Sequence, residues 1–132
     1  MIKRVKFRLA GLGALILILS AILITGCDSG GSYTIFAGSI SQNETSIEGS
    51  YKHFDGYYFR SLDLEKGDTV RFNLGKTTES GSLSIQLKKE DIDAVFIIEN
   101  DTLVEIEQSG TYKVEALGNS HQGDFQLTWQ TN

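Results

Sequence analysis

The chain has 132 residues, with 17 acidic residues, 12 basic residues, one cysteine and no proline. Four of the basic residues lie within the first eight positions, so the part after residue 26 carries eight basic residues against all 17 acids, a net charge of −9. This acidity argues against binding nucleic acid, whose phosphates require lysine and arginine. The single cysteine excludes a disulfide within the chain and a metal site built from several thiolates.

The first 26 residues have the pattern of an export signal. A basic start precedes an apolar run over residues 9–24, and the run closes on Leu-Ile-Thr-Gly-Cys at residues 23–27. This ending resembles the lipobox of bacterial lipoproteins. The resemblance implies cleavage between Gly26 and Cys27 and a diacylglyceryl group on the Cys27 thiol. We therefore expect residues 1–26 to be a lipoprotein signal peptide with a helical apolar stretch.

The expected location follows from this signal. An uncleaved transmembrane anchor is the alternative, but 16 residues are fewer than the ~20 that a membrane-spanning helix needs. Both interpretations leave the basic end in the cytoplasm and the rest outside. Two acyl chains are enough to hold a protein firmly on a bilayer. We expect a cell-membrane lipoprotein on the extracytoplasmic face, with residues 27–32 as the lipidated cysteine and a flexible Ser-Gly-Gly-Ser tether.

From residue 33 onward, apolar and polar residues alternate with the period of two that is typical of half-buried strands. The clearest alternating sets cover residues 33–37, 70–74, 83–87, 104–106, 112–116 and 125–129. Residues 94–99 are predicted to form another strand, with a one-turn helix before it as the alternative. Turn-forming residues lie at 66–68, 80–81, 100–101, 109–110 and 118–123. We predict an all-β fold for residues 33–132, a single antiparallel, jelly-roll-like β-sandwich after the signal helix.

Residues 57–129 resemble the small β-sandwiches known as bacterial pre-peptidase C-terminal domains, which also occur in short Gram-positive lipoproteins. The matching segments are an aromatic-rich strand at 57–64, Lys-Gly-Asp-Thr-Val at 66–70, Ser-Gly-Thr-Tyr-Lys-Val at 109–114 and a closing strand at 123–129. Residues 89–93 depart from the pattern, because such domains usually carry an Asp-Gly turn there. The resemblance implies an accessory fold without catalysis and supplies no substrate.

The strongest candidate for a ligand-binding site is residues 51–60, which contain five aromatic side chains. The candidate residues are Tyr51, Asp55, Tyr57, Tyr58 and Arg60. An exposed row of rings could stack on sugars, whereas buried rings would only fill the core. Alternation places Tyr58 and Arg60 on the inward face, so Arg60 needs a polar partner, for which Asp55 is the candidate.

Two other groups of residues suggest metal chemistry. His53 and His121 are the only histidines and could meet on adjacent strands, which would suit a metal-assisted hydrolase. Glu90, Asp91 and Asp93 offer oxygen atoms for calcium but lack the spacing of a calcium-binding loop. We expect neither group to bind metal, and we expect no catalytic residue and no cofactor.

The main hypothesis is a monomeric, lipid-anchored and non-catalytic lipoprotein of the cell envelope, acting as an accessory or binding module. One alternative is a module that binds carbohydrate or a wall polymer. Another is a protective or inhibitory lipoprotein that binds a protein partner, for which the acidity of the domain and its short tether are the only indications. The expected partners are therefore the membrane, through Cys27, and a glycan or an envelope protein.

Overall fold

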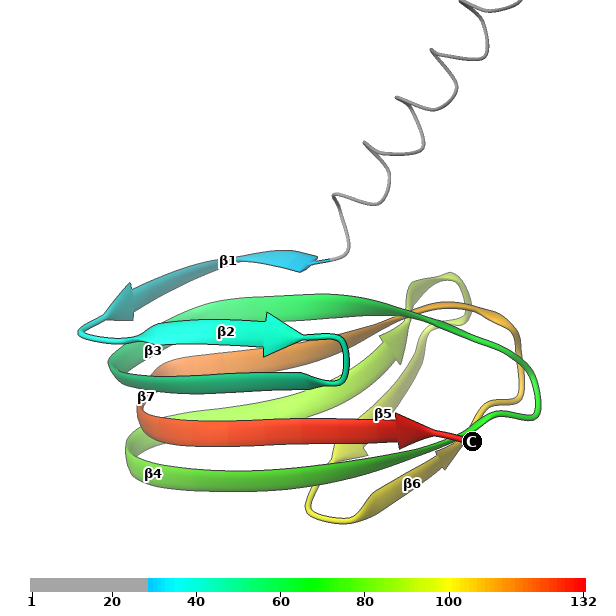
Figure 1. The fold of residues 1–132 in the computed structure, drawn as a ribbon. Coiled ribbons are helices and arrows are strands. Elements are labelled where there is room, and N and C mark those ends of the chain that lie inside the picture. The colour runs from blue at the N-terminus through cyan, green and yellow to red at the C-terminus, as the bar shows by residue number, and fades with distance from the viewer. Residues whose placement is uncertain (1–28) are drawn as a thin grey trace, which may run out of the picture.

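The computed structural model describes residues 29–132, which contain seven strands and one short 3-10 helix (Figure 1). The elements are β1 (Ser29–Phe36), β2 (Ser39–Asn43), β3 (Ser46–Leu64), β4 (Thr69–Lys89), η1 (Glu90–Ile92), β5 (Ala94–Ile98), β6 (Thr102–Glu105) and β7 (Gly110–Thr131). The predicted signal peptide, its helix, its cleavage site at Gly26 and the lipidation site Cys27 lie outside the described residues.

The strands form an antiparallel sheet that folds over on itself. The order is β1-β3-β7-β4-β5, with β2 also paired to β3 and β6 also paired to β4. The three long strands β3, β4 and β7 bend at the same end of the molecule, at the left in Figure 1. Their pairing shifts register within residues 51–56 of β3 and 78–82 of β4. The predicted all-β antiparallel sandwich is confirmed.

Each long strand therefore contributes to two layers. Layer A contains β2, the first part of β3, the last part of β7, the first part of β4 and β6. Layer B contains β1, the last part of β3, the first part of β7, the last part of β4 and β5. Alternate residues of both layers point inward and form one buried core, which includes Ile47, Phe72, Ile85, Leu87, Val114, Leu127 and Trp129.

Two predicted turns lie inside strands. Residues 80–81 belong to β4, and residues 118–123 belong to β7. Gly81 has φ 71°, and an added Cβ there would lie 2.1 Å from the carbonyl oxygen of Ser120. The glycine therefore permits two strands to pass closely at the bend. These turn-forming residues bend the strands without reversing the chain.

The structure also differs from the prediction that residues 29–32 form a flexible tether. Residues 29–32 lie in β1 and pair with residues 57–60 of β3. Gly31 has φ 144°, and a Cβ there would lie 2.2 Å from the carbonyl oxygen of Tyr57. The glycine thus serves a close approach between strands and not chain flexibility. Only Asp28 separates Cys27 from the first strand.

Other local predictions are confirmed. At residues 65–68 the amide of Asp68 donates to the carbonyl oxygen of Glu65 at 2.9 Å, which closes the turn between β3 and β4. Both structures considered for residues 88–99 are present, since η1 directly precedes β5. Asp93 follows η1 with φ 53°, a left-handed conformation that stops the helix before the strand begins.

Candidate functional site

The alternation of β3 divides the aromatic cluster between two sides of layer B. Tyr51, Phe54 and Tyr58 are buried in the core. Tyr57 is 39% exposed and points outward, to the side of the sheet opposite that of Tyr58. The prediction that these rings could stack on a ligand therefore has a different outcome for each ring. Tyr51 and Tyr58 fill the core and cannot stack on an external ligand, whereas Tyr57 can.

Tyr51 belongs to a buried polar network at the bends of the long strands. Its hydroxyl contacts Nδ1 of His121 at 2.8 Å, and Nε2 of His121 contacts Oγ1 of Thr78 at 2.9 Å. Burial raises the pKa of Tyr51, and Asp124 raises it further. Burial lowers the pKa of His121, as does the charge of Lys76, while Asp124 opposes the shift. This network joins β3, β7 and β4 at the point where each one bends.

The predicted pair between Asp55 and Arg60 is wrong. Residues 55 and 60 are an odd number of positions apart on one strand, so they point to opposite faces. Oδ1 of Asp55 instead accepts a hydrogen bond from the backbone amide of Ser120 at 2.9 Å. The buried Nε of Arg60 has no hydrogen-bond partner among the described residues. Asp55 therefore holds the bend of β7, and Arg60 lies at the edge of the core.

The outer side of layer B carries a pair of stacked rings. Tyr57 and Phe59 have ring centroids 6.5 Å apart and an interplanar angle of 20°. The strand register places Phe59 beside Glu115 of β7, and Glu115 beside Gln86 of β4. Lys113 lies one pair further along β7, with its Nζ 4.6 Å from the centroid of Phe59. We call Tyr57, Phe59, Gln86, Lys113 and Glu115 the ring face.

The polar groups of the ring face are held in place beside the rings. Nε2 of Gln86 donates to Oε1 of Glu115 at 3.2 Å. Nζ of Lys113 donates to Oε1 of Glu90 at 3.1 Å, and the same ammonium lies over the Phe59 ring. The face thus offers an aromatic platform next to amide, carboxylate and ammonium groups. Such a combination can stack on a sugar ring and bond its hydroxyls.

The outer side of layer A is different in chemistry. A shallow groove of about 700 Å³ crosses β2, β3, β7 and β4 there. It is lined mainly by short polar and acidic side chains, including Ser39, Ser41, Glu48, Thr77 and Asp124. Its only ring belongs to Phe125, which is buried. The groove can accept hydrogen bonds but lacks an exposed ring for stacking.

The histidines do not form the alternative metal site. His53 lies opposite Phe36 of β1, while the ring nitrogen atoms of the buried His121 contact the hydroxyl groups of Tyr51 and Thr78. Within residues 29–132, no group of three His, Cys, Asp or Glu side chains could hold a metal ion. The arrangement of His53 and His121 therefore gives no support to a metal-assisted hydrolase.

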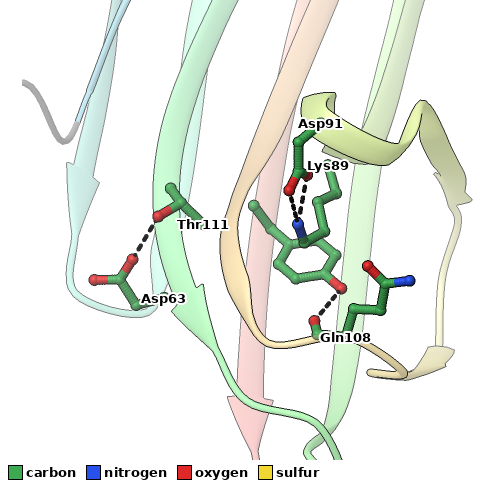
Figure 2. A network of polar contacts seen from close by, with 6 residues as sticks. Asp63, Lys89, Asp91, Gln108 and Thr111 are labelled. Carbon is green, nitrogen blue, oxygen red and sulfur yellow. Dashed lines mark hydrogen bonds and ion pairs between the residues drawn. The ribbon is translucent and has the colours of Figure 1, made fainter.

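The acidic residues around η1 bind lysines of this chain. Figure 2 shows the buried Lys89, whose Nζ donates to both carboxylate oxygen atoms of Asp91. The same Nζ lies 5.8 Å from the ring centroid of Tyr112. The Tyr112 hydroxyl donates to the carbonyl oxygen of Gln108 at 2.7 Å. The hydrogen bond from Lys89 is the main reason that the pKa of Asp91 is lowered. Two of the three carboxylates considered for calcium, Glu90 and Asp91, are thus in ion pairs.

Sequence reasoning identified Tyr57 but missed the other four residues of the ring face. A signal was present, because Phe59 follows Tyr57 at the spacing of one strand face, and Lys113 and Glu115 share that spacing on the strand predicted at 112–116. Only the register between β3, β7 and β4 brings these residues side by side. Sequence spacing does not reveal that register.

Neither a family model nor a curated protein matches the chain. Three solved structures of variants of carbohydrate binding module family 29 are similar to it. The first has a TM-score of 0.42 at 10% identity and covers 77% of this chain and 81% of that one. The second has a TM-score of 0.37 at 10% identity and covers 75% of this chain and 78% of that one. The third has a TM-score of 0.35 at 11% identity and covers 79% of this chain and 80% of that one.

Within residues 29–132, no helix has the length and apolar character required to cross a membrane.

Proposed function

We propose that this protein is a non-catalytic binding module that holds a glycan on its ring face and is anchored to the outside of a bacterial cell membrane through Cys27. The observation that carries the glycan proposal is the stacked pair of Tyr57 and Phe59 on the outer side of layer B. Two parallel rings on one strand present a flat apolar surface, which suits the apolar side of a pyranose ring.

The groups beside the rings support a polar, hydroxyl-rich ligand. Gln86 and Glu115 are bonded to each other, so their remaining donors and acceptors are fixed next to the platform. Lys113 adds a positive charge over the Phe59 ring. An open sheet face suits a chain of sugars that lies across it, whereas a small ligand is usually enclosed in a deep pocket.

The lipid anchor is supported by the sequence of residues 23–27 and sets how far the ring face lies from the bilayer. Tyr57 pairs with Ser32, which is five residues from Cys27. Five residues of fully extended chain span at most ~18 Å. The ring face would therefore meet glycans close to the membrane surface, such as the inner part of the wall or lipid-linked polymers.

The glycan proposal is tested with a Tyr57→Ala, Phe59→Ala double variant of the domain from residue 29 onward, attached to a surface at its N-terminus in place of the lipid. Retention of isolated peptidoglycan and of a soluble β-glucan is compared with wild type. We expect the variant to lose at least about tenfold in affinity, which corresponds to ~1.4 kcal/mol and is typical of a central aromatic contact.

The control is Leu103→Ala, which removes a 52%-exposed apolar side chain from β6 in layer A. This variant should keep both glycan retention and melting temperature. A double variant that retains both polymers as wild type does would overturn the proposal. So would a wild-type domain that binds neither polymer nor any member of a glycan array.

A further inference from the structure

One segment of the chain combines negative charge with exposed apolar side chains. Residues 90–107 contain seven acidic residues and no basic residue. Of the eight large hydrophobic side chains that are exposed in residues 29–132, five lie in this segment: Ile92, Val95, Phe96, Ile97 and Leu103. Apart from the ion pair of Glu90 with Lys113, the ring face uses neither property, and their coincidence needs a separate explanation.

The centre of this segment is an unprotected edge strand. β5 ends the strand order of layer B, and within residues 29–132 it pairs only with β4. Its sequence, Ala-Val-Phe-Ile-Ile, has no charge and no proline, and its pairing with β4 has no bulge. Charges, prolines and bulges are the usual means by which proteins block an edge from adding another strand. β5 has none of these.

A small crevice lies beside this edge, between β5 and β6. Its volume is about 160 Å³, enough for one aliphatic side chain. Its apolar wall includes Ile92, Phe96 and Tyr112, and the carboxylates of Glu105 and Glu107 form its polar side. An apolar side chain of an added strand would fit this crevice.

The charges of the segment are only partly used inside the molecule. Asp91, Glu90 and Asp101 are in ion pairs with Lys89, Lys113 and Arg71. The other four carboxylates are exposed and have no ion pair within residues 29–132: Asp93, Glu99, Glu105 and Glu107. Asp93 and Glu99 lie at the two ends of β5, and the other two lie at the crevice.

The two carboxylates at the ends of β5 indicate which kind of strand could pair with its free edge. If a second copy of this chain paired antiparallel through β5, centred on Phe96, Asp93 of each copy would lie opposite Glu99 of the other. Like charges placed directly opposite each other destabilise strand pairing. A strand with alternating basic and apolar residues would place positive charges there instead.

We propose that β5 is a docking edge for an extended segment of a partner protein in which basic and apolar residues alternate. The segment adds to layer B as an outer strand through backbone hydrogen bonds with β5. An apolar side chain of the partner enters the crevice beside Phe96. Its basic side chains point to the other face of the added strand and lie opposite Asp93 and Glu99. This edge adjoins the ring face, because Ile97 pairs with Gln86, but the docking proposal does not depend on the glycan proposal.

The probe is a ten-residue peptide of alternating lysine and valine, with a glutamate–valine peptide of the same length as its counterpart. The domain is titrated with each peptide, and amide hydrogen exchange is followed at residues 94–98. We expect the lysine–valine peptide alone to bind and to slow exchange at these amides. The same peptide with alternate amides N-methylated should bind at least about tenfold more weakly, because it cannot form the strand ladder.

The charge requirement is tested with an Asp93→Asn, Glu99→Gln variant, which should bind at least about tenfold more weakly than wild type. Glu44→Gln, Glu79→Gln makes the same change in net charge at exposed sites elsewhere and should bind within about twofold of wild type. Three results would overturn the proposal: an equal loss in both variants, binding without slower exchange at 94–98, or protection of these amides that rises with protein concentration in the absence of peptide. The last result would assign the edge to a second copy of the chain.

Discussion

His121 fastens three strands where each of them bends. It is fully buried, and both of its ring nitrogen atoms contact hydroxyl groups, from Tyr51 on β3 and Thr78 on β4. A neutral imidazole has one donor and one acceptor, so it can satisfy both hydroxyls, one as donor and one as acceptor. Protonation turns both nitrogen atoms into donors, which the two hydroxyl oxygen atoms could still accept, but it places a charge on a fully buried ring. Burial therefore favours the neutral ring.

This preference for the neutral ring predicts a loss of stability in mild acid. The pKa of His121 is lowered in the folded state, so below the ordinary value of about 6.5 the unfolded state binds the proton more readily. The free energy of unfolding, measured by urea titration, should be constant from pH 8 to about pH 7 and fall between pH 6.5 and 5. In the His121→Gln variant the curve over this interval should be flatter. Parallel curves for the two proteins would contradict the role of this residue.

The same residues show what the sequence reveals at this scale. Alternation predicts correctly that Tyr58 faces inward, and Tyr58 is 8% exposed. It does not reveal that Asp55 meets the amide of Ser120, 65 positions away, because that contact depends on how β3 and β7 bend together. The pairing of Asp55 with Arg60 was inferred from their nearness in sequence. The face to which a residue points on its own strand is predictable, whereas contacts across strands require the register.

Among the elements, β1 illustrates how glycine can be misread. Its Ser-Gly-Gly-Ser start has the composition of a flexible linker, yet it pairs along its whole length with β3. A glycine-rich composition indicates only that the unfolded chain is flexible. In the folded chain Gly31 is needed because the backbone of Tyr57 lies where a side chain would be. The turn-forming residues in β4 and β7 show the same ambiguity. Local sequence predicts turns between strands there, whereas in the structure these residues form bends within strands.

The strand role of residues 29–32 predicts the effect of Gly31→Ala. The new methyl group would lie 2.2 Å from the carbonyl oxygen of Tyr57. The alanine would also have to adopt φ 144°, so β1 must move away from β3. We expect a destabilisation of about 1–3 kcal/mol in urea, with faster hydrogen exchange at residues 57–60. Gly75→Ala is the matched control, because nothing lies within 4 Å of the added methyl group. Equal stability of both variants would restore the flexible-tether interpretation.

For the molecule as a whole, the proposed lipid on Cys27 would lie very close to the fold and would determine its position at the membrane. With Asp28 alone between Cys27 and β1, the start of β1 would lie at the headgroups. The net charge of −9 after residue 26 opposes contact with anionic lipid, so the lipid itself would have to supply the attachment. Two acyl chains are sufficient for this purpose.

Replacement of Cys27 tests this attachment in the full chain. Cys27→Ala should abolish labelling with radioactive palmitate and move the protein out of the membrane fraction, or leave the precursor uncleaved. Ser29→Ala, two residues further on, should keep both labelling and membrane association. Since Cys27 is the only thiol, palmitate that remained on the Cys27→Ala variant would show that the lipobox interpretation is wrong.

The position of β7 has a consequence for the order in which the molecule can assemble. β7 is the last of the described strands along the chain, yet it lies between β3 and β4 in both layers. Neither layer can close before β7 pairs, and contacts between residues that are distant in sequence form slowly. Until β7 pairs, β3 and β4 lack the strand that joins them, so both layers assemble around this one element.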